Sequence, residues 1–358
     1  MSTPDSPLDI EDLRSRVSQA LTDFLTRQRP KLCDISEELG VLDSALIDLL
    51  RGGKRLRPAF CWWGWRAAGG DHESSGALIA AASLELLQGS ALVHDDVMDD
   101  SDTRRGMPAA HKRFSAIHLA NGWGGDADRF GDAAAILLGD LCLSWTDDLF
   151  FSCGLPADAI LRAKPVLDIM RTELLGGQYL DLLEQAKGSA SPERALRVAR
   201  YKSAKYTIER PLQLGATLAN GSPELLGALS GYGLPIGEAF QIRDDVLGVF
   251  GDPEITGKPA GDDLREGKRT YLVAVALQSA DQDQRQTLLE GLGNPELSQA
   301  AISAMREVII STGALAQTED LIARRTEQAL RALDTVVLDP TVRNVLSDLA
   351  FIATSRSH

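Results

Sequence analysis

Residues 74–99, SSGALIAAASLELLQGSALVHDDVMD, form a long apolar segment that ends in acidic residues. Asp95 and Asp99 lie four residues apart, on one face of the expected helix. Like charges at this spacing repel one another, and anions at a helix C-terminus oppose the helix dipole. A solvated helix end is one interpretation. The other is a Mg²⁺ site, because Mg²⁺ prefers carboxylate oxygens and shares its coordination shell with substrate phosphates.

The rest of the chain shows the same helical spacing of apolar residues, without the period-two runs typical of strands. We therefore expect an all-α fold, a single domain over residues 1–358 built as a bundle of about ten or more helices. A surface loop is expected at residues 121–132. The expected helices are 9–28, 31–50, 58–69, 74–99, 131–152, 157–185, 192–219 and 223–250, followed by shorter ones after about residue 270.

The chain is acidic, with 37 Lys and Arg against 51 Asp and Glu and a formal charge of −14. Nucleic acid is therefore a poor partner, because its phosphates would be repelled. Glu85 and Asp95 interrupt the apolar segment, so we expect no membrane insertion. The N-terminus is acidic, unlike an export signal, and the four cysteines include no C-x-x-C pair. These features predict a cytoplasmic protein.

A second acidic cluster, FQIRDDVLG at residues 240–248, also ends an apolar helical segment. Two such clusters are hard to explain as solvated helix ends. Basic residues gather at 53–58, at Arg104 and Arg105, at Lys202 and at 257–270. Lysine acts on phosphate as a point charge and arginine as a bidentate clamp. Together the clusters predict a site for a metal-bound polyphosphate.

These motifs resemble those of the head-to-tail trans-isoprenyl diphosphate synthases, the polyprenyl synthetase family, and especially its geranylgeranyl diphosphate synthases. The matching segments are GGKRLRP at 52–58, DDVMD and RRG within 95–106, GQYLDL at 177–182, YKS at 201–203, FQIRDD at 240–245 and GKPAGDDLREGKRT at 257–270. The resemblance covers residues 52–270. It implies an all-α homodimer whose helices surround a central catalytic cavity. The implied reaction is the Mg²⁺-dependent joining of isopentenyl diphosphate to an allylic diphosphate: dimethylallyl, geranyl or farnesyl diphosphate.

The same resemblance implies roles for individual residues. Asp95, Asp96 and Asp99 are expected to hold two Mg²⁺, and Asp244 a third. The side chains expected at the allylic diphosphate are Arg104, Lys202, Ser203, Gln241, Lys258 and Lys268. Those expected at isopentenyl diphosphate are Lys54, Arg57, Gln88 and Arg105. This division is chemically sensible, because only the allylic diphosphate departs and needs its growing negative charge stabilised.

Three positions depart from the family pattern. Gln88 stands where many relatives have histidine, and Ser203 replaces threonine; both keep their hydrogen-bonding ability. Gly248 stands where the second acidic motif usually has a third aspartate. Aspartates follow downstream at 252, 262 and 263. We expect Asp244 to supply the direct metal ligand, so that the enzyme is active without an aspartate at position 248.

The helix that ends at Asp95 also predicts the product length. Each turn advances about 5.4 Å, close to one isoprene unit. In the family, bulky aromatic residues four and five positions before the first aspartate stop growth at C15, whereas here Ala91 and Ser90 are small. Leu87 and Leu84 lie one and two turns deeper and favour a C20 product, geranylgeranyl diphosphate. Farnesyl and C25-type products are the alternatives, and the small residues could also serve only helix packing.

Two other functions fit part of the pattern. A terpene cyclase also uses an aspartate-rich helix and Mg²⁺, but it binds one diphosphate and leaves Lys54, Arg57 and the Lys258–Lys268 segment without a use. A non-catalytic subunit of another synthase is expected to have lost its acidic motifs, and only Gly248 hints at such a loss.

Overall fold

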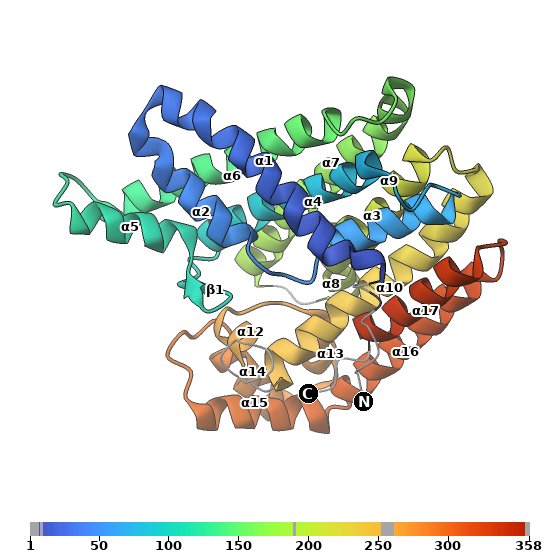
Figure 1. Cartoon of the computed structure of the whole chain (residues 1–358). Coiled ribbons are helices and arrows are strands. Elements are labelled where there is room, and N and C mark those ends of the chain that lie inside the picture. The colour runs from blue at the N-terminus through green and yellow to red at the C-terminus, as the bar shows by residue number, and fades with distance from the viewer. Residues whose placement is uncertain (1–6, 8–9, 189–190, 252–260, 355–358) are drawn as a thin grey trace, which may run out of the picture. The chain divides into compact units, whose positions relative to one another are not determined.

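Figure 1 shows the computed structural model of the chain, which describes residues 7, 10–188, 191–251 and 261–354. These residues form two compact units. Of the described residues, those up to 62 and those from 70 to 160 form the first unit, and residues 63–69 and those from 161 onward form the second. Helices α3 (Leu56–Ala67) and α7 (Ala157–Lys187) cross these limits. The all-α prediction is confirmed, whereas the single-domain organisation stays a prediction.

The first unit is built around α4 (Ser75–Met98), which packs against α1, α2, α5 and α6. The hydroxyl of Ser74 caps its start by accepting a hydrogen bond from the N–H of Ala77 at 3.2 Å. The other elements are η1 (Ile10–Asp12), α1 (Leu13–Ile35), η2 (Glu37–Leu39), α2 (Gly40–Leu50), the strands β1 (Thr103–Arg104) and β2 (Met107–Pro108), α5 (Ala110–Ala120) and α6 (Ala127–Phe151). Figure 1 shows α1 and α2 side by side, and α5 beside α6.

Helix α4 is the core helix of this unit. Among the residues that the structure describes, it is the one helix long and apolar enough to cross a membrane, although most of that apolar stretch is buried within the protein. Burial on this scale is typical of the core helix of a globular protein.

The second unit is built around α10 (Pro223–Phe250), which packs against α9, α16, α17 and the π-helical segment η3. The other elements are α8 (Pro192–Val198), η3 (Ala199–Glu209), α9 (Arg210–Leu218), α12 (Asp262–Arg265), α13 (Tyr271–Ser279), α14 (Gln282–Gly291), α15 (Gln299–Ser311), α16 (Ala314–Leu333) and α17 (Pro340–Thr354). Ile242, Val246 and Val249 of α10 share one apolar core with Leu264 and Leu272.

Two expected boundaries are wrong, and one expected helix has a different interior. The break between residues 28 and 31 does not occur, because α1 continues through Pro30 to Ile35. The expected loop at 121–132 is shorter, since Asp126 caps α6 by accepting hydrogen bonds from the N–H groups of Asp128 and Arg129. The helix expected at 192–219 contains the π-helical segment η3 between α8 and α9.

Helix α5 was not predicted. Its buried face consists of His111, Phe114, Ser115 and His118, at the three- and four-residue spacing of a helix. Three of these four side chains are polar, so apolar periodicity gave little signal.

Candidate active site

The last turn of α4 carries the first aspartate cluster, Asp95, Asp96 and Asp99. The N–H of Asp99 donates to the carbonyl of Asp95 at 2.9 Å, and the N–H of Ser101 donates to that of Asp96 at 2.9 Å. These bonds satisfy two of the last carbonyls of the helix and hold its end in a fixed conformation. The side chain of Asp95 is 24% exposed and that of Asp96 only 2%.

Arg104 lies against this cluster because the β1–β2 hairpin turns the chain back, pairing Arg104 with Met107. The Nε of Arg104 donates to both carboxylate oxygens of Asp96, at 2.9 and 3.2 Å. Its Nη2 lies 3.7 Å from Oδ2 of Asp95. Burial raises the pKa of the Asp96 carboxyl, and the Arg104 guanidinium opposes that rise. Arg104 therefore offsets part of the charge of the cluster and orients Asp96.

The next residue, Arg105, lies over the glycine-rich loop before α3. A Cβ atom at Gly53 would lie 3.4 Å from Nη2 of Arg105, so the guanidinium stacks close to this backbone. Its Nη1 donates to the carbonyl of Leu49 at 3.3 Å. Gly53 has a φ of 88°, a left-handed conformation that glycine adopts without strain. The loop GGKRLRP and the Arg104–Arg105 pair therefore meet within the first unit.

We call Arg55, Arg57 and Arg105 the arginine cluster. Burial lowers the pKa of the Arg105 guanidinium. The nearby charge of Glu85 opposes this change, while the positive charges of Arg55, Arg104 and Arg57 add to it. Mutually repelling cations of this kind favour the binding of an anion.

Arg55 and Glu85 form a buried ion pair that the sequence reasoning missed. Nη1 of Arg55 lies 2.6 Å from Oε2 of Glu85, and each residue is 5% exposed. Nη2 of Arg55 donates to the carbonyl of Leu50 at 2.6 Å. The pair fastens the GGKRLRP loop to α4. One signal was available: a glutamate within an otherwise apolar helix needs a buried cationic partner.

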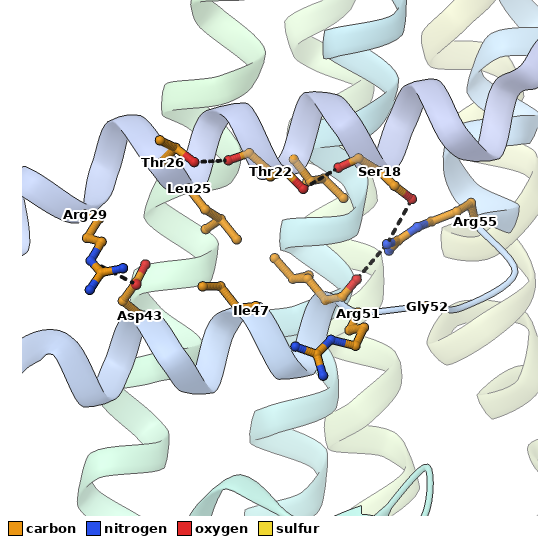
Figure 2. Close-up of a pocket in the computed structure, with 12 residues that line it drawn as sticks. Ser18, Thr22, Leu25, Thr26, Arg29, Asp43, Ile47, Arg51, Gly52 and Arg55 are labelled. Carbon is orange, nitrogen blue, oxygen red and sulfur yellow. Dashed lines mark hydrogen bonds and ion pairs between the residues drawn. The ribbon is translucent and has the colours of Figure 1, made fainter.

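A pocket of about 340 Å³ opens between α1 and α2, next to the same loop (Figure 2). The Arg29–Asp43 ion pair lies at one end, where Nε and Oδ2 are 3.7 Å apart, and Arg55 lies at the other. Its lining residues are Ser18, Leu21, Thr22, Leu25, Thr26, Arg29, Asp43, Ile47, Leu50, Arg51, Gly52 and Arg55. None of the predicted site residues lines it, and it meets the site only at the glycine-rich loop and Arg55.

The predicted isopentenyl diphosphate residues all belong to the first unit. Lys54 is exposed, whereas Arg57 and Gln88 are half-buried. Arg105 stands over the loop that carries Lys54 and Arg57.

In the second unit, Lys202 of η3 pairs with Asp181 of α7, Nζ to Oδ2 at 2.7 Å. Gly177 allows this approach, because a Cβ atom there would lie 2.2 Å from the backbone nitrogen of Lys202. Both the glycine and the aspartate of the GQYLDL motif therefore help to position Lys202: Gly177 lets its backbone approach, and Asp181 pairs with its side chain. Ser203 is half-buried beside it. π-helical turns often occur at functional sites.

An ion network fixes the far end of η3 to α7. Glu173 lies 2.9 Å from Nζ of Lys205 and 2.7 Å from Nε of Arg210. Burial opposes the ionisation of Glu173, but the hydrogen bonds from Arg210 and Lys205 outweigh it and lower the pKa of this carboxyl.

The second aspartate cluster, Asp244 and Asp245, lies near the end of α10. Asp245 is 8% exposed and accepts a hydrogen bond from Nε2 of Gln241 at 2.8 Å. Burial raises the pKa of Asp245 to about 8, and the negative charge of Asp263 contributes to the rise. Asp244 is half-buried. Gln241, predicted to bind diphosphate, here orients a neighbouring carboxyl group.

Two predicted lysines follow this cluster in the sequence. Nζ of Lys268 lies 3.5 Å from Oδ1 of Asp263 and also pairs with Glu266. Lys258 lies outside the described residues.

The residues predicted to set the product length lie along α4. Leu84, Leu87 and Ser90 are 0%, 2% and 4% exposed. Ala91 is half-buried, as is Asp95 one turn later. Of these four residues, Ala91, the nearest to the aspartates, is the most accessible.

The donor set of the first aspartate cluster fits magnesium. Asp95 and Asp99 offer carboxylate oxygens one helical turn apart, and Mg²⁺ commonly takes one or two carboxylates while keeping waters and substrate phosphates. Among the described residues, no three His, Cys, Asp or Glu side chains already surround one point. The carboxylate of Asp96 instead accepts a hydrogen bond from Arg104.

Comparisons with known proteins agree with these features. The model of the family described as polyprenyl synthetase matches residues 40–309. A geranylgeranyl diphosphate synthase of Methanosarcina mazei is 32% identical over 351 residues, 98% of each chain. A geranylfarnesyl diphosphate synthase of Aeropyrum pernix is 32% identical over 82% of this chain and 87% of its own.

A solved structure is also similar. It is a geranylgeranyl pyrophosphate synthase from Corynebacterium glutamicum, complexed with isoprenyl diphosphate and magnesium. Its sequence is 44% identical, the match covers 98% of this chain and 100% of that one, and the TM-score is 0.94. The chain belongs to the polyprenyl synthetase family of trans-isoprenyl diphosphate synthases.

Proposed function

We propose that this protein condenses isopentenyl diphosphate head-to-tail with an allylic diphosphate in a Mg²⁺-dependent reaction that yields geranylgeranyl diphosphate. One observation carries the proposal: Arg104 and Arg105, adjacent in sequence, serve different clusters. Arg104 contacts the first aspartate cluster, which suits a metal-bound diphosphate. Arg105 stands in the arginine cluster, which suits a diphosphate without metal. Head-to-tail condensation needs two diphosphates of different fate, whereas a terpene cyclase binds one.

The allylic diphosphate is the leaving group. Magnesium would offset the negative charge that develops on the departing oxygen. Asp95 and Asp99 would hold the metal, and Arg104, already oriented by Asp96, would donate to the diphosphate oxygens. Metal-holding roles for Asp96 and Asp244, and a complement of three Mg²⁺, remain part of the proposal. So do roles at the allylic diphosphate for Lys202, Ser203, Gln241, Lys258 and Lys268.

Isopentenyl diphosphate keeps its diphosphate through the reaction. Lys54, Arg57 and Arg105 would neutralise this group without a metal that activates its departure. Gln88 would add a hydrogen bond. The double bond then attacks the allylic cation, and loss of a proton from the new carbon chain restores a double bond. The released diphosphate is the proposed proton acceptor, so no side-chain base is required.

The exposure of α4 supports a C20 product. Ala91 is small and half-buried, which suits a chain passing one turn beyond the aspartates, and the buried Leu87 and Leu84 would stop the chain at greater depth. Dimethylallyl, geranyl and farnesyl diphosphates would all be accepted as starters, because each intermediate serves as the next substrate.

A starter series tests this function. Purified protein is incubated with labelled isopentenyl diphosphate, Mg²⁺ and each allylic diphosphate in turn, and the products are separated by chromatography. The proposal expects geranylgeranyl diphosphate from all three starters. Hydrocarbons formed without isopentenyl diphosphate would indicate a cyclase instead. No turnover by the protein alone would indicate a non-catalytic subunit.

We also propose a cytoplasmic homodimer. Phe130, Ile136 and Leu137 of α6 are 39%, 45% and 64% exposed, and Trp123 just before α6 is 49% exposed. Phe130 and Leu137 are two turns apart on one face, so this patch suits a self-complementary interface. Sedimentation should show a dimer that Leu137→Glu converts to a monomer; a wild-type monomer would contradict the proposal.

A further inference from the structure

A hydrogen bond joins α4 to α6 immediately before the first aspartate cluster. Nε2 of His94 lies 3.1 Å from the carbonyl oxygen of Ile136, and Oδ1 of Asp140 lies 3.5 Å from the same nitrogen. Because a carbonyl oxygen can only accept, Nε2 carries the proton and donates it. The His94 side chain is 21% exposed, so the protein covers most of the ring. With its proton given to α6, Nε2 has no lone pair for a metal.

Gly139 of α6 makes room for this contact. A Cβ atom built on Gly139 would lie 2.2 Å from Nε2, 2.5 Å from Cδ2 and 2.8 Å from Cε1 of His94. A real side chain at position 139 would therefore displace the imidazole from α6. His94 and Gly139 are a matched pair: the ring can lie on α6 because the glycine has no side chain.

A second close approach fixes α4 against α6. Five residues before His94, a Cβ atom at Gly89 would lie 3.3 Å from Sγ of Cys142, which follows Gly139 by three residues. The two helices are therefore antiparallel neighbours, since later residues of α4 meet earlier residues of α6. Within this register, His94 makes the contact at the end of α4 that carries the aspartates.

The last turn of α4 is thus held from two directions. His94 ties it to α6, and Asp96 ties it to the β1–β2 hairpin by accepting hydrogen bonds from Arg104. A shift of this turn would move Asp95 and Asp99 together, because both residues belong to it. Metal-binding side chains must be held within about 0.5 Å of their working geometry. A contact that fixes this turn therefore bears on the metal site.

We propose that His94 is a positioning residue, which holds the aspartate-bearing end of α4 on α6 and so places Asp95 and Asp99 for magnesium. This inference rests on the proposed function. Loss of a group that orients metal ligands commonly costs 10–100-fold in metal affinity or activity. We expect the lower end of that range, because His94 acts through the backbone of α4 rather than on a ligand directly.

The test uses four variants of the full chain: His94→Ala, His94→Gln, Gly139→Ala and the double variant His94→Ala/Gly139→Ala. His94→Gln is the conservative control, because the glutamine amide can donate to the Ile136 carbonyl in place of Nε2. Gly227→Ala in α10 is the control for Gly139→Ala, since a Cβ there would meet nothing within 4 Å.

Three readouts are compared. The first is the Mg²⁺ concentration that gives half-maximal turnover, and the second is the KM for each substrate. The third is the rise in unfolding temperature caused by Mg²⁺ with inorganic pyrophosphate, which needs no catalysis.

We expect His94→Ala to raise the half-maximal Mg²⁺ concentration about tenfold, to raise the KM for the allylic diphosphate and to lose most of the Mg²⁺–pyrophosphate shift. The KM for isopentenyl diphosphate should change little, because that substrate binds without the metal. His94→Gln and Gly227→Ala should stay near wild type. Gly139→Ala should reproduce His94→Ala, and the double variant should be no worse than His94→Ala, because both changes remove the same contact.

Normal Mg²⁺ dependence and a normal pyrophosphate shift in His94→Ala would overturn the proposal and leave His94 a packing role. Equal losses in His94→Ala and His94→Gln would also overturn it, since the hydrogen bond would then not matter. If Gly139→Ala does not fold, the comparison of the two His94 variants decides the question. If the wild type shows no transferase activity, the proposed function fails, but the pyrophosphate shift still tests His94.

Discussion

Replacing Glu85 by alanine should destabilise the protein more than removing any exposed charged side chain does. The variant leaves the Arg55 guanidinium buried without its carboxylate partner, which now lies 2.6 Å away. Loss of one partner of a buried pair costs about 3–5 kcal/mol. Arg55 would keep its hydrogen bond to the Leu50 carbonyl, so we expect the lower end of this range, about 3 kcal/mol. That cost corresponds to about a 100-fold change in the unfolding equilibrium.

Urea unfolding followed by tryptophan fluorescence measures this cost. Asp168→Ala is the control, because Asp168 and Lys164 form an ion pair in which both side chains are nearly half exposed. Its loss should cost less than about 1 kcal/mol. The apolar double variant Arg55→Met/Glu85→Leu should recover most of the lost stability, because it leaves no unpaired buried charge. Equal, small effects of Glu85→Ala and Asp168→Ala would refute the reasoning.

The ion pair also connects stability with binding. It fastens the loop that carries Lys54 and Arg57 to α4, so Glu85→Ala should raise the KM for isopentenyl diphosphate. An unchanged KM would show that the loop keeps its conformation without the pair.

Three other predictions follow from the site. Asp95→Ala should lower turnover by orders of magnitude, while metal-free thermal stability stays unchanged or rises; near wild-type turnover would contradict the metal assignment. Ser90→Phe or Ala91→Phe should shorten the main product to C15 or less while the first condensation persists, and unchanged products in both would disprove the predicted role of α4. Glu173→Gln should be less stable than wild type at neutral pH, because the folded-state pKa of Glu173 lies below its ordinary value of 4.5. This difference should disappear as the pH falls through the lowered pKa, and a difference independent of pH in urea unfolding would contradict it.

Most of the helical architecture could be predicted from apolar periodicity, because long amphipathic or apolar segments leave a clear pattern. The best examples are α4, within the predicted segment 74–99, and α10, within the predicted helix 223–250. The break expected after residue 28 was wrong, because α1 continues through Pro30 to Ile35. The buried face of α5 is mainly polar and left no such pattern.

The site was predictable where it depends on motifs and not where it depends on contacts between distant residues. The Asp–Asp spacing and the paired arginines were visible in the sequence. The Arg55–Glu85 pair joins residues 30 apart, and the left-handed φ of Arg55, 53°, has no local signal in the sequence. The meeting of Asp263 with Gly248 likewise depends on how α12 packs on α10. Spacing alone therefore showed that position 248 lacks a carboxylate, but not that the Asp263 carboxyl group lies beside it.

The central claim is that two diphosphates bind differently, one with the first aspartate cluster and one with the arginine cluster. Steady-state kinetics of Arg104→Gln and Arg105→Gln, with each substrate varied in turn, tests it most directly. We expect Arg105→Gln to raise the KM for isopentenyl diphosphate about tenfold or more with little change for the allylic substrate, since it removes a charge from the arginine cluster. We expect Arg104→Gln to lower kcat and to weaken the binding of the allylic diphosphate, seen as a higher KM for that substrate. Equal effects of both variants on both substrates would contradict the division.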